Sequence, residues 1–343
     1  MFVINSQGLA SNLDDTLKAI PVAPKVFSPF LYSVISGVLI SHGHNLFLRT
    51  TPRQLLLGHK INIFDTMSSM VEPLSVFGIK KEDLVPVEDL PNNAFGILNG
   101  KNGTKNGPFE MYTGVRDQSK YGYLLSYKSE SKQFKFPDEK CDIIYGTDGA
   151  QFPPFRSKRD KLPIFTPDLC RTLWLTYSEE TEFKGIPVWK MKLDSKMFEP
   201  PQMNPLNKCY CMHWKRRPDR CSVSGTIDLG ACLNGAPLIL SAPHFLDTNP
   251  PLYEQVSGLK PDRSKHEFSL MFEPRIGSPI YAYGRMQLSV RVEKTSFLRG
   301  FNNLRNTFIP FVWIEEVRFS FISNYSVSNN SFLIFHYPPH FII

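Results

Sequence analysis

The chain has no hydrophobic run long enough to cross a bilayer. Its longest apolar stretch, residues 30–40, is interrupted by Ser33, Ser36 and Gly37, and it is about half of the roughly 20 residues that a membrane-spanning helix needs. Residues 1–25 also lack a basic segment followed by an apolar one, because Asp14 and Asp15 stand where a signal peptide would be hydrophobic. As written, the sequence predicts neither a transmembrane segment nor a signal peptide.

The motifs of common enzyme classes are absent as well. The sequence contains no nucleophile elbow, phosphate loop, zinc-protease helix motif or Cys-His signature. His244, in the run Pro243-His244-Phe245, is interpreted as a packed structural histidine, with a catalytic base as the less favoured alternative. We therefore predict that the protein is not an enzyme and that it uses no cofactor.

Neither sign of charge dominates the composition. The 39 Lys and Arg residues against 32 Asp and Glu residues give a net charge of +7, which favours acidic partners but does not predict nucleic-acid binding. With 42% apolar and 21% charged residues, the chain is typical of a globular protein and not of a disordered or coiled-coil one. Its 28 prolines predict short strands and many turns, because proline interrupts helices and central strands.

Helical spacing is confined to the first seventy residues. Apolar residues three and four apart predict a helix over residues 29–41. Thr51-Pro52 is a typical helix start and Gly58 a typical stop, so a second short helix is expected between them.

Beyond about residue 93 the apolar residues alternate with polar ones. This period predicts strands around residues 109–115, 173–177, 189–193 and 286–292, each with one face in the core and one in water. In the last of these, Met286 and Leu288 are expected in the core and Gln287 and Ser289 in water. The pattern favours a mainly β protein of the α+β class, with a large antiparallel sheet or barrel and a helical cap.

All six cysteines lie between residues 141 and 232. An even, clustered set suggests disulfides, but spacing alone does not choose among the fifteen possible connectivities. Cys209 and Cys211 are expected to bond to other cysteines, because a bridge between two such close positions would be strained. Unpaired core thiols remain an alternative, and so does a zinc site made of Cys209, Cys211, His213 and Cys221, although its spacing is unusual for zinc.

Glycosylation acceptors support an oxidising compartment. Asn102-Gly-Thr lies in a predicted exposed turn and is the acceptor on which we rely; the acceptors at Asn324 and Asn329 lie in the C-terminal tail.

Two basic clusters are candidate sites for anionic ligands. One consists of Lys215, Arg216, Arg217 and Arg220, and the other of Arg156, Lys158, Arg159 and Lys161. Either cluster is equally compatible with a solvated basic loop.

Several motifs together resemble those of a known family. The run from Gly146 to Phe155, Gly-Thr-Asp-Gly-Ala-Gln-Phe-Pro-Pro-Phe, is similar to a signature of class B scavenger receptors, which include fatty-acid translocase and lysosomal integral membrane protein two. Further motifs follow in family order: Asp168-Leu169-Cys170-Arg171, Lys184-Gly185-Ile186-Pro187-Val188, Cys209-Tyr210-Cys211, Pro243-His244-Phe245 and Phe272-Glu273-Pro274. The resemblance covers about residues 10–316, and the wording of the motifs resembles that of invertebrate members.

This resemblance implies a fold and three disulfides. The fold is an antiparallel β-barrel-like ectodomain with apical helices and an apolar tunnel for lipid. The implied bridges join Cys141 to Cys209, Cys170 to Cys232, and Cys211 to Cys221. By the same comparison, we expect residues 1–70 to be a partial apical helical region, 71–316 the β-rich core, and 317–343 a divergent, disordered tail. The chain is thus expected to be truncated at both ends and to hold an incomplete barrel.

The resemblance also implies a function. We expect a receptor of the plasma membrane that binds and transfers lipids of the sterol, fatty-acid or carotenoid class, or captures lipoprotein-like particles. The alternatives are a lysosomal membrane receptor that transports a hydrolase and a secreted lipid-carrying glycoprotein. We expect no metal and no nucleic-acid partner.

Overall fold

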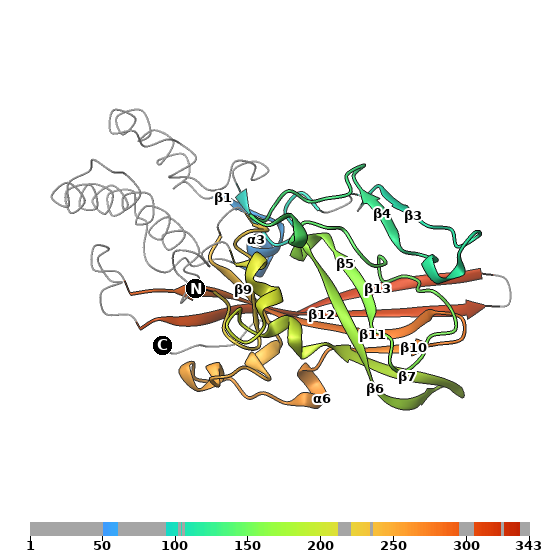
Figure 1. Ribbon diagram of the computed structural model, residues 1–343. Coiled ribbons are helices and arrows are strands. Elements are labelled where there is room, and N and C mark those ends of the chain that lie inside the picture. Colours follow the sequence, from blue (N-terminus) through green and yellow to red (C-terminus); the bar gives the residue numbers. More distant parts are fainter. Residues whose placement is uncertain are drawn as a thin grey trace. The chain divides into compact units, whose positions relative to one another are not determined.

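The computed structural model describes residues 51–60, 94–101, 104, 107–211, 221–233, 236–294, 305–323 and 326–336 (Figure 1). The chain forms two compact units. The smaller consists of Met1–Asn106, Leu233–Leu238 and Val290–Ile309, and the larger of Gly107–Cys232, Ile239–Ser289 and Pro310–Ile343.

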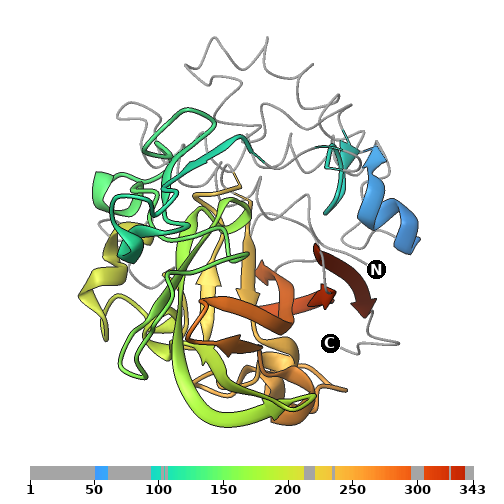
Figure 2. The same ribbon diagram turned by 90° about the vertical axis from the view of Figure 1, so that its right-hand side faces the viewer.

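In the smaller unit, the short helix predicted after Thr51 is confirmed. Helix α3 (Pro52–Leu57) begins with a capping box, in which the Gln54 backbone N–H donates to Thr51 Oγ1 at 3.3 Å and the Thr51 backbone N–H donates to Gln54 Oε1 at 3.0 Å. Gly58 ends the helix with a φ of 131°. Strand β1 (His59–Lys60) follows and pairs with β2 (Ala94–Phe95); these elements are blue and cyan in Figure 2. The helix expected at residues 29–41 lies outside the described residues.

The main sheet has nine strands in the order β13-β12-β11-β10-β7-β6-β5, with β9 pairing to both β11 and β8. Its members are β5 (Leu162–Thr166), β6 (Arg171–Phe183), β7 (Ile186–Leu193), β8 (Thr226–Asp228), β9 (Leu238–Ser241), β10 (Ser269–Glu273), β11 (Ser278–Val292), β12 (Thr307–Ser323) and β13 (Ser326–His336). A separate hairpin joins β3 (Phe109–Met111) to β4 (Leu124–Tyr127). The predicted mainly β, antiparallel character is confirmed. Within the described part of the chain, the sheet path is open between β13 and β5 and does not close into a barrel.

Short helical turns connect these strands. The only α-helical one in the described part of the larger unit is α6 (Arg263–His266). The others are 3-10 turns: η2 (Gln118–Lys120), η3 (Glu139–Cys141), η4 (Pro167–Leu169), η5 (Ser195–Phe198), η6 (Pro205–Tyr210), η8 (Pro243–Phe245) and η9 (Leu252–Gln255).

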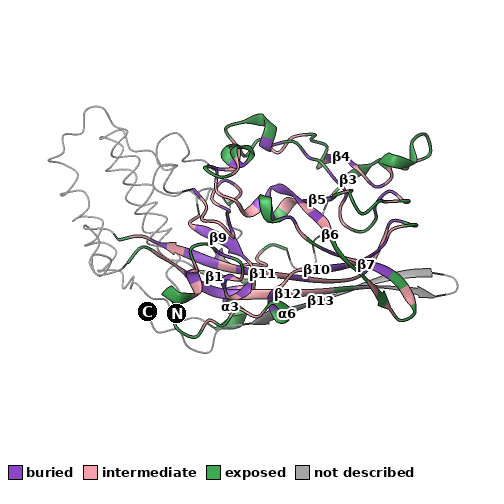
Figure 3. Cartoon of the chain, turned by 60° about the horizontal axis from the view of Figure 1, so that its bottom comes forward, coloured by how far each residue is buried: buried purple, intermediate pink, exposed green. Residues whose placement is uncertain are grey.

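The core lies on one face of strands β6, β7 and β10. Alternate residues of these strands pack with residues from β5 and the preceding loop, and the buried cluster is Phe152, Leu162, Leu175, Met191, Leu270 and Phe272. The predicted alternation of β6 and β7 is thereby confirmed. All four residues of β9 are buried, as Figure 3 shows. Glu179 and Glu180, near the turn between β6 and β7, are exposed.

Two predicted strands differ from expectation. Strand β3 ends at Met111, and Val115, expected in the core, is 88% exposed. In β11, Gln287 and Ser289 are buried although their side of the strand was predicted to face water. Gln287 Nε2 donates to Ser241 Oγ at 3.3 Å, and its Oε1 accepts the His244 N–H at 2.8 Å, so hydrogen bonds replace the water that the pattern implied.

The C-terminal segment also differs from expectation. Residues 317–323 continue β12, and Ser326–His336 forms β13, which pairs antiparallel with it from Ser323↔Ser326 to Trp313↔His336. A disordered tail was expected there. The structure instead has a hairpin, whose backbone ladder requires no alternation of apolar and polar side chains.

Among the described residues, no helix has the length and apolar character needed to span a membrane. The helical cap and the apolar tunnel remain predictions.

Candidate functional site

Three disulfides bind together the segment from residue 141 to residue 232. They join Cys141 to Cys209, Cys170 to Cys232, and Cys211 to Cys221, with Cα–Cα distances of 5.8, 5.5 and 5.5 Å. These are the pairs that the family resemblance implies. Because every cysteine sulfur is in a bridge, the zinc alternative and the free-thiol alternative do not hold.

The bridges bring two of the sequence motifs into contact around a buried arginine. Arg171 follows Cys170 at the start of β6, and Tyr210 stands between Cys209 and Cys211 in the sequence. The guanidinium carbon of Arg171 lies 4.0 Å from the centre of the Tyr210 ring. Its Nη2 is 3.5 Å from the Met197 carbonyl oxygen, whereas its buried Nε has no acceptor among the described residues. Burial lowers the pKa of Arg171, and the ring face compensates part of the lost hydration.

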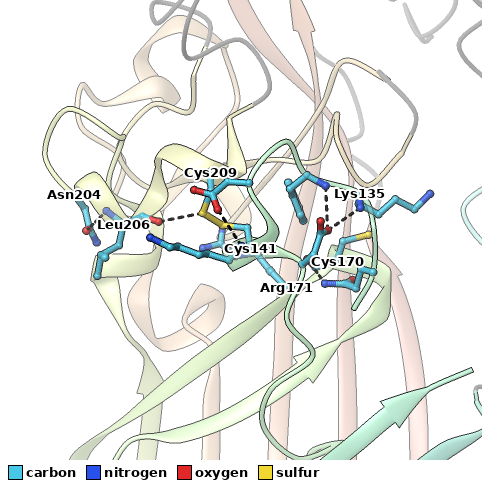
Figure 4. Close-up of a disulfide and its surroundings, with 12 residues drawn as sticks. Lys135, Cys141, Cys170, Arg171, Asn204, Leu206 and Cys209 are labelled. Carbon is cyan, nitrogen blue, oxygen red and sulfur yellow. Dashed lines mark hydrogen bonds between the residues drawn. A yellow bond between two sulfur atoms is a disulfide. The ribbon is translucent and has the colours of Figure 1, made fainter. Parts of the chain in front are cut away.

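The neighbourhood of the Cys141–Cys209 bridge is held by local hydrogen bonds (Figure 4). One Asp142 carboxylate oxygen accepts the backbone N–H groups of Lys135 and Phe136 at 2.7 and 3.0 Å, and Asn204 Oδ1 accepts the Leu206 N–H at 3.2 Å. The bridge therefore joins two segments that are already ordered by their own turns.

The signature run that begins at Gly146 forms a tight connection beside β5. The Thr147 N–H donates to the Pro163 carbonyl at 3.0 Å, and the Phe165 N–H donates to the Thr147 carbonyl at 2.8 Å. Gly146 has a φ of 112°, and a Cβ there would lie 2.8 Å from the Pro163 oxygen, so a side chain does not fit. These residues have a structural role.

The same run anchors the core against a second motif. Phe152 and Phe272 are both fully buried, and their rings meet edge to face at 5.5 Å. The Phe152 N–H donates to the Gly277 carbonyl at 2.9 Å. Glu273 organises the intervening turn, because its carboxylate accepts the Ile276 N–H and Arg275 Nε, both at 2.8 Å.

The second basic cluster is largely neutralised by nearby carboxylates. Lys158 Nζ lies 2.7 Å from Glu180, Lys161 Nζ 2.5 Å from Asp194, and Arg156 Nε 3.4 Å from Asp160. Arg159 is exposed. This pairing favours the solvated-loop interpretation over a strong anion site.

The remaining predicted site residues lie outside the described part of the chain. They are Asn102 and the basic residues Lys215, Arg216, Arg217 and Arg220. Within the described ranges, no group of three or more His, Cys, Asp or Glu side chains is arranged to hold a metal ion.

The contact between Arg171 and Tyr210 was not predicted. A signal for it was present: each residue adjoins a cysteine, and the bridges implied by the resemblance fix both ends of the segment. The stack of His244 on His266, with ring centres 4.3 Å apart, was also missed, since nothing in the spacing of the two residues connects them.

Comparison with known proteins places these motifs in a wider group. The family described as the CD36 family matches residues 3–340. Sensory neuron membrane protein 1 of Aedes aegypti is 33% identical over 239 residues, or 70% of this chain and 43% of the relative. Scavenger receptor class B member 1 of Rattus norvegicus is 28% identical over 278 residues, or 81% of this chain and 50% of the relative. Sensory neuron membrane protein 2 of Aedes aegypti is 28% identical over 289 residues, with 79% and 52% covered. The chain spans about half the length of these relatives.

Proposed function

Because the chain belongs to the CD36 family, we propose that it acts as a class B scavenger-type receptor that binds lipids or lipoprotein-like particles and transfers lipid. The lipid class is a sterol, a fatty acid or a carotenoid. The site of action is the plasma membrane, and the protein has no catalytic role.

The observation that carries this proposal is the extent of the family match. It runs from residue 3 to residue 340, and relatives that it resembles are named as receptors or membrane proteins. The matched motifs are also the residues that build the fold here, such as Phe152 against Phe272 in the core and Arg171 against Tyr210 beside the bridges. The same framework therefore supports the same kind of ligand handling.

The proposal assigns different tasks to the apolar interior and to the basic cluster Lys215, Arg216, Arg217 and Arg220. The interior takes up the lipid, since an enclosed apolar cavity removes the hydrocarbon from water. The four cations of the cluster assist the encounter with an anionic particle, because charges at a surface raise association rates more than affinity and are screened by salt.

The test compares three forms of the protein, each joined to the segments that flank the matched region in a relative. They are the unchanged protein, a variant with the four cluster residues replaced by Ser, and a control. The control replaces four exposed cations outside both basic clusters by Ser and therefore changes the net charge equally: Arg116, Lys128, Lys140 and Lys192. Native mass spectrometry measures bound lipid, and a lipoprotein-capture assay at low salt measures encounter.

We expect bound lipid in all three forms and weaker particle capture in the cluster variant alone. Protein that carries no lipid would refute the lipid assignment, and equal capture by all forms would refute the role of the cluster. Capture of a hydrolase from a purified panel, without particle capture, would favour the lysosomal receptor. Lipid bound without any particle capture would favour the secreted carrier.

A further inference from the structure

Two histidine rings from distant parts of the sequence stack on each other. His244 lies in the turn η8, and His266 is the last residue of α6. Their ring centres are 4.3 Å apart and their planes differ by only 7°. Trp313 of β12 packs its ring against His266 at 5.7 Å, and His266 is 5% exposed. The stack is therefore a contact between a half-buried ring of η8 and a buried ring of α6.

Both rings accept a backbone hydrogen bond through Nδ1. The Lys260 N–H donates to His244 Nδ1, and the Asp262 N–H donates to His266 Nδ1, each at 2.9 Å. An accepting Nδ1 carries no proton, so each ring is neutral with its proton on Nε2. The stack holds residues 260–262 by two bonds that exist only while the imidazoles are neutral.

Among the charged groups around the stack, Asp262 favours an imidazolium ion at His266, whereas Arg285 and Lys265 oppose one. The acids are already paired: Arg263 binds Asp247 and Glu267, Arg285 binds Glu315, and Lys265 lies 3.4 Å from Asp262. Lys190 adds a further positive charge beside Glu267 at 3.8 Å, and Lys260 adjoins the stack through its own backbone. Burial, and then the neighbouring His244, lower the pKa of His266 to about 4.

We propose that the His244–His266 stack is an acid-sensitive latch on residues 260–262. A proton that binds Nδ1 of either ring turns the acceptor into a donor, which then faces another N–H donor. A charge on both rings adds repulsion across the stack. Residues 260–262 and α6, which carries His266, are thereby released together as one segment. The bonds that Arg285 Nη1 donates to the carbonyls of Ser264 and Glu267, at 3.4 and 3.1 Å, oppose this opening.

The magnitude follows from proton linkage. In the released segment His266 regains an ordinary pKa near 6.5, so the open form binds a proton over a range in which the closed form does not. The open population therefore grows as the pH falls from about 6.5 towards about 4. Between about pH 7 and about pH 4.5, protonation of His266 alone increases the ratio of open to closed molecules on the order of fiftyfold.

Backbone hydrogen exchange of the full chain, expressed with an added signal peptide so that its disulfides form, tests the latch. Peptides that cover residues 258–268 are followed by mass spectrometry at both pH values and corrected for intrinsic exchange, with peptides of β7 as an internal reference. The double variant His244→Asn/His266→Asn keeps an acceptor, because Asn Oδ1 takes the place of Nδ1, but it does not titrate. The control His59→Asn removes an imidazole from β1.

We expect hydrogen exchange of residues 258–268 to increase on acidification in the unchanged protein and in His59→Asn, and not to increase in the double variant. An equal increase in the double variant, or no increase in the unchanged protein, would overturn the proposal. If the double variant loses protection in β7 and is therefore unfolded, the imidazole nitrogen shifts of the unchanged protein decide instead. The latch requires an unprotonated Nδ1 in both rings at neutral pH, and a protonated one refutes it.

Discussion

Removing one disulfide at a time should lower the stability of the larger unit according to the length of chain that each bridge closes. Cys170–Cys232 spans 62 residues of sequence and Cys211–Cys221 spans 10. In the chain-entropy treatment, these loops correspond to about 4.3 and about 2.7 kcal/mol. When the bridge Cys141–Cys209 is intact, it shortens the loop of chain that Cys170–Cys232 closes. Because the entropy depends on the logarithm of loop length, this lowers the contribution of Cys170–Cys232 to stability by only a few tenths of a kcal/mol.

The experiment replaces each bonded pair by Ala. Cys170→Ala/Cys232→Ala should cost about 1.5 kcal/mol more than Cys211→Ala/Cys221→Ala. Urea unfolding followed by tryptophan fluorescence measures the difference, since all four tryptophans belong to the larger unit. Peptide mapping without reduction must first show the two remaining bridges in each variant. An equal loss, or a greater loss from the shorter bridge, would refute the loop-length argument.

Three further predictions concern single side chains. Phe152→Ala should lower the free energy of unfolding by about 3–5 kcal/mol because Phe152 is fully buried. Phe155→Ala, at a position 76% exposed, should change it by about 0.5 kcal/mol or less. Urea unfolding midpoints measure both changes, and similar losses in the two variants would contradict the assignment of Phe152 to the core. Gly277→Ala should reduce the yield of folded protein much more than Gly185→Ala. Both glycines have a positive φ, but a Cβ added at Gly277 would lie 2.1 Å from the Phe152 carbonyl oxygen, whereas one added at Gly185 would have no atom within 4 Å. Burial lowers the pKa of His266 to about 4, so the unfolded chain binds more protons below about pH 6.5. Stability should therefore fall by about 3 kcal/mol between about pH 6.5 and about pH 4, and unfolding curves of His266→Asn should lack this part of the loss.

The sequence predicted strands well where one face of the strand is core. Leu175 and Met191 are buried as their alternation predicts. In β11 the same reasoning failed at Gln287, because its polar groups are satisfied by Ser241 and the His244 backbone and not by water. Hydropathy does not reveal a polar side chain whose partners come from another segment.

Prediction of the site depended on the family resemblance. Cysteine spacing left fifteen connectivities open, and the resemblance selected the three pairs that the structure also has. The β12–β13 hairpin was not predicted, because its pairing depends on backbone groups that every residue carries. The two histidines escaped prediction for a different reason: only the folded chain brings them together.

The order of the bridges along the chain bears on how the protein withstands proteolytic nicking. Cys141–Cys209 and Cys170–Cys232 overlap in sequence, so at least one of them spans every peptide bond between residues 141 and 232. A single cut anywhere in that stretch, including the basic stretch at Lys215, leaves both fragments joined covalently. A nicked molecule would migrate as one chain until its disulfides are reduced, and only then would the two fragments separate.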